Sequence, residues 1–269
     1  MKSRVSAVAS GLKATSIFFL AVCAIGILAA RAGAVESKPA VSAINAKVSG
    51  GYADLSADKT WFGDGSVTIP VGHSFGVALD GIGGDYSADA MWGMGGTLFW
   101  RNPDQGLLGI IGSETQIGSY ESYRGGATGE LYLGPVSLSA DAGYQNGRSI
   151  KGGLFSQLGL NWYPMDNLSL GTGCAYSGRD TAGLVNVEYM PGLKVLPGVA
   201  FFADARWGES NYHSFLTGVT YYFGPGNKSL KARHREDDPQ NQALKGLFLA
   251  SQGGLTNAPA PVTTQPPPD

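Results

Sequence analysis

The stretch Gly72-His73-Ser74-Phe75-Gly76 contains residue types that could perform hydrolysis. It fits the pattern G-x-S-x-G, in which a tight turn between a strand and a helix exposes a nucleophilic serine. Here the turn follows Pro70 and leads into residues 76–84, a glycine-rich run that resembles a strand. Because no helix is expected after Ser74, we interpret the motif as a short turn between two strands rather than as a nucleophile elbow.

A second His-Ser pair, His213 and Ser214, opens another segment with strand-like alternation. Neighbouring residues of a strand point to opposite faces, which disfavours a catalytic dyad at this pair and at His73 with Ser74. The three histidines are scattered, and Cys174 is the only cysteine outside the first 34 residues. The sequence therefore indicates no catalytic residues, no metal site and no cofactor.

The first 34 residues have the three parts of a secretory signal peptide. Lys2 and Arg4 begin it, residues 17–30 are apolar, and residues 32–34 form an A-x-A cleavage site. The apolar run is shorter than the about 20 residues that a membrane-spanning helix needs. Removal of this segment leaves 15 of the 19 basic residues against all 21 acidic residues. We expect an exported protein that does not bind nucleic acid, since it lacks a basic excess.

Prolines divide the rest of the chain into six blocks, each of roughly 30 residues. Each block contains a second break without proline, for example at residues 54–60 and 145–149, and so splits into two runs of about ten residues. Proline cannot donate to a strand ladder, so it belongs in the connections or at strand starts. The blocks predict twelve strands in successive hairpins, although ten remain an alternative. The dividing prolines are Pro39, Pro70, Pro103, Pro135, Pro164, Pro191 with Pro197, and Pro225.

The runs alternate between an apolar face and a face of glycine, polar and charged residues. Val136 and Leu138 face one way, for example, and Ser137 and Ser139 the other. Strands of about ten residues with this alternation are typical of a transmembrane barrel. Such a sheet must close, because lipid cannot form hydrogen bonds with the backbone groups at an open edge. A water-soluble barrel or sandwich is the alternative. The scarcity of charges (15% of residues) and the aromatic residues near strand ends favour lipid on the outside.

The last predicted strand lies within residues 214–224 and closes on the aromatic residue Phe223. This strand resembles the terminal assembly signal of bacterial outer-membrane barrels, and the chain resembles their small porin-like members. The resemblance implies an all-β, closed, antiparallel up-and-down barrel over residues 35–224, in the outer membrane of a Gram-negative bacterium. It also implies contact with outer-membrane lipid and with the barrel-insertion machinery. The signal residues would be Phe215, Val219, Tyr221 and Phe223.

The polar face of a twelve-stranded barrel would line its lumen. Such a lumen lies between the filled interior of eight-stranded barrels and the open channel of sixteen-stranded porins. We predict passive passage of small hydrophilic solutes, filtered by charge. A non-conducting structural or adhesive barrel and an outer-membrane lipid-modifying enzyme are the alternatives. The predicted lumen-lining residues are Lys47, Asp80, Arg124, Glu130, Asp141, Glu188, Asp204 and Arg206.

Residues 225–269 follow the predicted barrel. A charged cluster spans residues 228–238, one or two helical turns are expected within 240–251, and the end is rich in proline. We expect a flexible periplasmic tail, because such proline-rich sequence stays extended. Contact with peptidoglycan is a functional alternative. The tail is also the only segment suited to plug the lumen, since the predicted loops are short.

Overall fold

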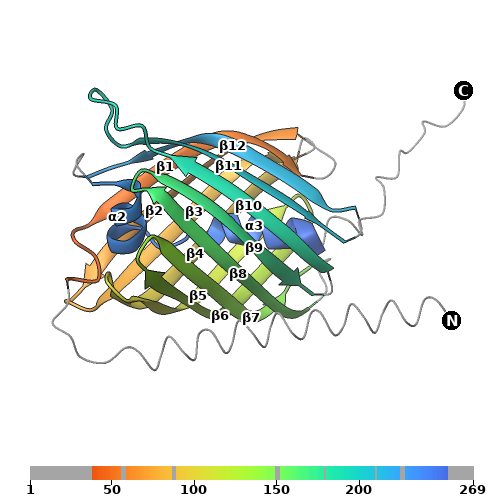
Figure 1. Ribbon diagram of the computed structural model, residues 1–269. Coiled ribbons are helices and arrows are strands. Elements are labelled where there is room, and N and C mark those ends of the chain that lie inside the picture. The colour runs from red at the N-terminus through yellow and green to blue at the C-terminus, as the bar shows by residue number, and fades with distance from the viewer. Residues whose placement is uncertain are drawn as a thin grey trace, which may run out of the picture.

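The chain forms a closed barrel of twelve antiparallel strands, in which each strand pairs with its neighbours in sequence (Figure 1). The computed structural model describes residues 38–55, 59–86, 89–148, 152–178, 180–209, 211–224 and 228–253. Pairing of the first strand with the last closes the barrel. The predicted fold class and strand number are confirmed. The strands are β1 (Asn45–Leu55), β2 (Lys59–Val71), β3 (Phe75–Tyr86), β4 (Asp89–Asn102), β5 (Gly106–Ile117), β6 (Tyr120–Leu133), β7 (Val136–Asn146), β8 (Gly153–Met165), β9 (Leu168–Ser177), β10 (Asp180–Tyr189), β11 (Val199–Gly208) and β12 (His213–Tyr222).

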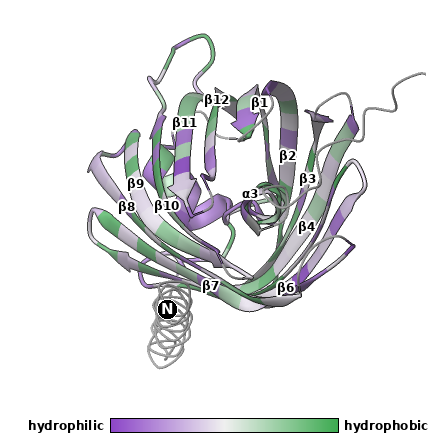
Figure 2. Ribbon diagram, turned by 90° about the vertical axis from the view of Figure 1, so that its right-hand side faces the viewer, coloured by the Kyte–Doolittle hydropathy of each residue, from purple (hydrophilic) through white to green (hydrophobic). Residues whose placement is uncertain are grey.

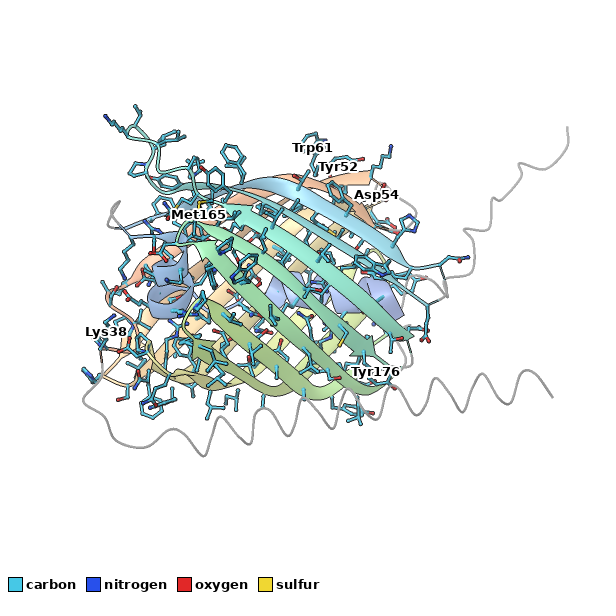
Figure 3. All side chains as sticks on the ribbon, viewed as in Figure 1. Lys38, Tyr52, Asp54, Trp61, Met165 and Tyr176 are labelled. Atoms are coloured by element: carbon cyan, nitrogen blue, oxygen red, sulfur yellow. The ribbon has the colours of Figure 1, made fainter. Side chains whose placement is uncertain are left out.

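The two kinds of sequence break lie at opposite ends of the barrel. Connections at or beside the dividing prolines join β2 to β3, β4 to β5 and so on, at the end that we call the proline end. The breaks without proline form the other end, which we call the far end. Lys38 lies at the proline end and Asp54 at the far end (Figure 3). The predicted signal peptide lies outside the described residues.

The outer face of the barrel is apolar. Large side chains such as Leu79, Ile110 and Leu160 are exposed on it, and Trp61 is 74% exposed. Outward aromatic residues gather near both ends, as expected at the two interfaces of a membrane. This polarity matches a barrel with lipid outside. Among the described residues, no helix is both long and apolar enough to cross a membrane. The aromatic rows include Phe75, Trp100, Trp162, Tyr189, Phe201, Tyr221 and Phe223 at the proline end, and Tyr52, Trp61, Trp92, Tyr123, Tyr144, Tyr176 and Trp207 at the far end.

The interior of the barrel contains the segment that follows β12, which differs from the expected flexible tail. Its elements are the short helix α2 (Leu230–Ala232), the π-helical turn η1 (Arg233–Asp237) and the helix α3 (Gln242–Gly253). Figure 2 looks into the barrel and shows α3 inside it, beside β2, β3 and β4. We call residues 228–253 the plug. Residues 254–269, which include the proline-rich end, lie outside the described part of the chain.

Candidate functional site in the barrel lumen

Neither His-Ser pair has the geometry of a catalytic site. Gly72 to Ser74 form the turn between β2 and β3, so the motif connects two strands as predicted, and no helix follows Ser74. In β12, His213 is exposed and the next residue, Ser214, is buried inside the barrel, where its hydroxyl lies 3.2 Å from that of Tyr212. Within the described ranges, no cluster of three or more His, Cys, Asp or Glu residues could hold a metal ion.

The first part of the plug, residues 228–238, lies across the proline end. The Lys231 ammonium pairs with Asp166 in the turn between β8 and β9. The Arg235 guanidinium donates to the Val136 carbonyl at 2.9 Å, at the start of β7. His234 lies between two tyrosines and 3.2 Å from a carboxylate oxygen of Glu188. The charged cluster is therefore bonded to the rim of the barrel rather than solvated.

Helix α3 begins at about mid-height in the barrel. The Asn241 side chain caps it, because its Oδ1 accepts a hydrogen bond from the Leu244 backbone N–H at 2.9 Å. The same side chain donates to Asp64 of β2 at 3.0 Å, and the Asp80 carboxylate of β3 accepts from the Gln242 N–H at 2.9 Å. Carboxylates are favourable beside the positive end of a helix dipole. Two carboxylates of the wall thus fix the start of α3.

The middle and end of α3 also bond to the wall. The Lys245 ammonium pairs with Asp141 of β7, whose side chain is only 3% exposed. At the C-terminal end, the Ser177 hydroxyl donates to the Leu249 carbonyl at 2.9 Å. The Gln252 amide donates to the Asp180 carbonyl at 2.7 Å. Since β9 ends at Ser177 and β10 begins at Asp180, α3 ends at the far end of the barrel.

Apolar packing and two glycines bring α3 close to the wall. Leu247 and Phe248 join a cluster of inward side chains near the far end of the barrel. A Cβ atom at Gly95 of β4 would lie 2.8 Å from the Ala243 backbone nitrogen. A Cβ atom at Gly246 of α3 would lie 2.7 Å from the Thr115 hydroxyl of β5. These glycines therefore permit the close contact of helix and sheet. The wall members of the cluster are Ala53, Leu55, Phe62, Ile82, Met91, Ile117 and Leu216.

A polar cavity of about 250 Å³ remains between α3 and the opposite wall. Asn161, Asn186 and Asp204 line it from β8, β10 and β11, and Asp238 of the plug lines it toward the proline end. Gln157 also lines the cavity, and its Oε1 is buried and has no hydrogen-bond partner among the described residues. Burial raises the pKa of the Asp238 carboxyl, and the positive charge of Lys47 opposes that shift.

The eight predicted lumen residues all lie inside the barrel, and they divide into two groups. Asp80, Arg124 and Asp141 contact α3, where Arg124 donates to the Lys245 carbonyl at 3.3 Å. The other five line the cavity: Lys47, Glu130, Glu188, Asp204 and Arg206. Some of these form pairs, such as Arg206 with Asp204 at 3.2 Å. The four predicted assembly residues, Phe215, Val219, Tyr221 and Phe223, lie on or just after β12; three of them are strongly exposed on the outer face.

The sequence reasoning missed the residues that hold the plug, above all Asp64, Asn241 and Lys245. Two signals could have found them. First, apolar residues such as Ile82 and Met91 interrupt the otherwise polar inner face, which requires something apolar inside the barrel. Second, the run from Ala243 to Ala250 is apolar enough to supply it.

Comparisons with known proteins agree on the fold. No family model and no curated protein matches this sequence. Among solved structures, the chain is similar to the KdgM porin, with a TM-score of 0.54 and 12% identity over 66% of this chain and 99% of that one. The same porin in complex with disordered oligogalacturonate gives 0.52, again at 12% identity over 66% and 99%. The NanC porin gives a TM-score of 0.50 at 9% identity, over 65% of this chain and 98% of that one. The chain thus has the fold of these porins.

Proposed function

We propose that this protein is a porin-like barrel of the outer membrane of a Gram-negative bacterium, through which small hydrophilic solutes diffuse along the polar cavity beside α3. The observation that carries the proposal is this cavity of about 250 Å³. Asparagine, glutamine and charged side chains of both signs line it, and such side chains replace part of the hydration shell of a passing solute. The similar KdgM porin, solved with disordered oligogalacturonate, supports a hydrophilic solute.

The membrane location rests on the outer face. An exposed belt of leucine, isoleucine, valine and aromatic residues would be costly in water and is favourable in lipid. The outward alternation of β12 supports recognition by the barrel-insertion machinery. Outer-membrane lipid and this machinery are therefore the proposed partners.

The test is conductance of the purified full chain in planar bilayers, with two matched tryptophan variants on one strand. Asn161 faces the cavity, and its neighbour Leu160 is 38% exposed on the outer face. We expect small, discrete conductance steps for the unchanged protein and for Leu160→Trp. Asn161→Trp fills part of the cavity, so its steps should be several-fold smaller. Equal conductance of the two variants would contradict passage along this cavity.

A non-conducting structural barrel is the second candidate, and a specific observation favours it. Helix α3 occupies one side of the lumen while residues 228–238 bond to the rim of the proline end. Bilayers that contain the inserted full chain but show no steps would support this candidate. Heat-modifiable gel migration verifies that the protein in either experiment is a folded barrel.

A further inference from the structure

The plug runs through the barrel from one end to the other. It begins at the proline end, where the Lys228 ammonium lies 2.9 Å from the Ser42 hydroxyl and the Leu230 N–H donates to Asn167 at 3.1 Å. It reaches mid-height at Gln242, beside Asp80. The twelve residues of α3 then cover about 18 Å along the helix axis.

The plug ends at the far end of the barrel. Gln252 bonds to Asp180, the first residue of β10, and the Ser251 hydroxyl lies 3.1 Å from that of Tyr212, just before β12. Both contacts are at breaks without proline. Figure 1 shows the same path, with α2 near one end of the barrel and α3 extending toward the other. Lys38 lies at the rim where the plug begins (Figure 3).

We infer that the chain is threaded through its own lumen, so that the sequence after Gly253 leaves the barrel on the opposite side of the membrane from Lys38. The chain is continuous, and residue 254 must follow Gly253 at the far end. Return to the proline end through the lumen would require a second segment beside α3, in a cavity of only about 250 Å³. The inference rests on the proposed membrane location and not on conduction.

The side of the membrane follows from the export of the chain. The segment before β1 bonds to the proline end, since the Ala40 N–H donates to the His73 carbonyl at 2.7 Å. The exported chain reaches the outer membrane from the periplasm, so we place this end there; connection length does not decide the side, because the longest connection, residues 190–198, is at the proline end. With the proline end in the periplasm, the proline-rich sequence 254–269 starts at the cell surface.

The experiment uses single cysteines in a full-length Cys174→Ser chain, on intact cells, with a maleimide coupled to a polyethylene glycol chain that is too large to pass through the lumen. Thr263→Cys reports on the sequence after the plug. Lys59→Cys, exposed at the start of β2, marks the far end. Asp104→Cys, whose native side chain is 67% exposed, marks the proline end. We expect Thr263→Cys to be labelled as fully as Lys59→Cys, and Asp104→Cys to be labelled only after the outer membrane is permeabilised.

The outcomes separate this inference from the proposed location. If Thr263→Cys behaves like Asp104→Cys, threading is wrong while the membrane location stands. If all three sites react equally in intact cells, the barrel does not separate two compartments, and both proposals fall. A chain carrying Thr263→Cys and Asp104→Cys together, in sealed vesicles of mixed orientation, should take one label per molecule. Molecules with two labels or none would overturn threading without any assumption about orientation.

Discussion

Two sides of the barrel interior follow the same alternating pattern and yet serve different purposes. The helix side, on β3 to β5, carries small or apolar inward residues such as Gly95, Ile82 and Thr115, and α3 packs against them. The cavity side, on β8 to β11, carries Asn161, Asn186 and other polar residues, and α3 bonds to this side only near the far end, at Ser177 and Asp180. The size and polarity of inward residues, rather than the strand pattern, decide which part of a lumen is filled and which part can hold water.

Removal of α3 should have the largest effect on this difference. A stop codon after Pro239 deletes the helix and leaves the helix side facing water, so the conducting cross-section should widen. We expect the conductance in planar bilayers to rise several-fold. A stop codon after Gly253 retains the helix and should leave the conductance unchanged. Equal conductance of the two truncated chains would show that α3 does not limit the lumen.

Loss of the buried ion pair should have the next largest effect. Lys245→Met keeps the length of the side chain but leaves the Asp141 carboxylate buried without its cation. Removal of one partner of a buried pair costs about 3 kcal/mol or more. We expect a corresponding fall in the free energy of unfolding, measured in detergent with urea. Addition of Asp141→Asn to this variant should restore most of the lost free energy of unfolding, because it removes the unpaired charge. A double variant as unstable as Lys245→Met alone would contradict a stabilising ion pair.

Crowding of the contact between helix and wall should have a smaller effect. In Gly246→Val the added atoms collide with Thr115, and overpacking of this kind costs about 1–3 kcal/mol. The control is Gly125→Val, because a Cβ atom at Gly125 meets nothing within 4 Å. We expect the unfolding midpoint in urea to fall for the first variant only. If both midpoints fall equally, the loss reflects the replacement of glycine rather than the contact with β5.

The smallest change in stability is expected on the cavity side. Asn186→Asp adds a negative charge to the cavity wall without removing a contact of α3. Because Asn186 lies directly opposite Asp204, the new carboxylate meets a like charge, and the free energy of unfolding should fall by no more than about 1 kcal/mol. The ratio of cation to anion permeability, measured from reversal potentials, should rise. Asn146→Asp, exposed at the end of β7, is the control and should leave the ratio unchanged.

The barrel could be predicted from sequence because each strand pairs with the next strand along the chain, so that nearby residues suffice to recognise it. Proline spacing places the connections of one end to within a few residues, although Pro70 and Pro164 lie in the last residues of β2 and β8, and the alternation of apolar and polar residues assigns the two faces of each strand. The sequence identified the tail as the only segment suited to plug the lumen, but the position of the plug could not be predicted, since it depends on contacts between distant residues, such as Asn241 with Asp64 and Lys245 with Asp141. The charged residues 228–238 resemble a solvated segment when read alone, and only the rim of the barrel supplies their partners.

The pairing of β1 with β12 also dictates an order of events during biogenesis. The sheet cannot close until the twelfth strand has been delivered, and the residues of the plug come after that strand in the chain. The apolar patch on the inner wall faces water in any barrel that closes without α3 inside it. Closure of the sheet around α3 would shield this patch from the start, so the plug and the β1–β12 seam are best formed together.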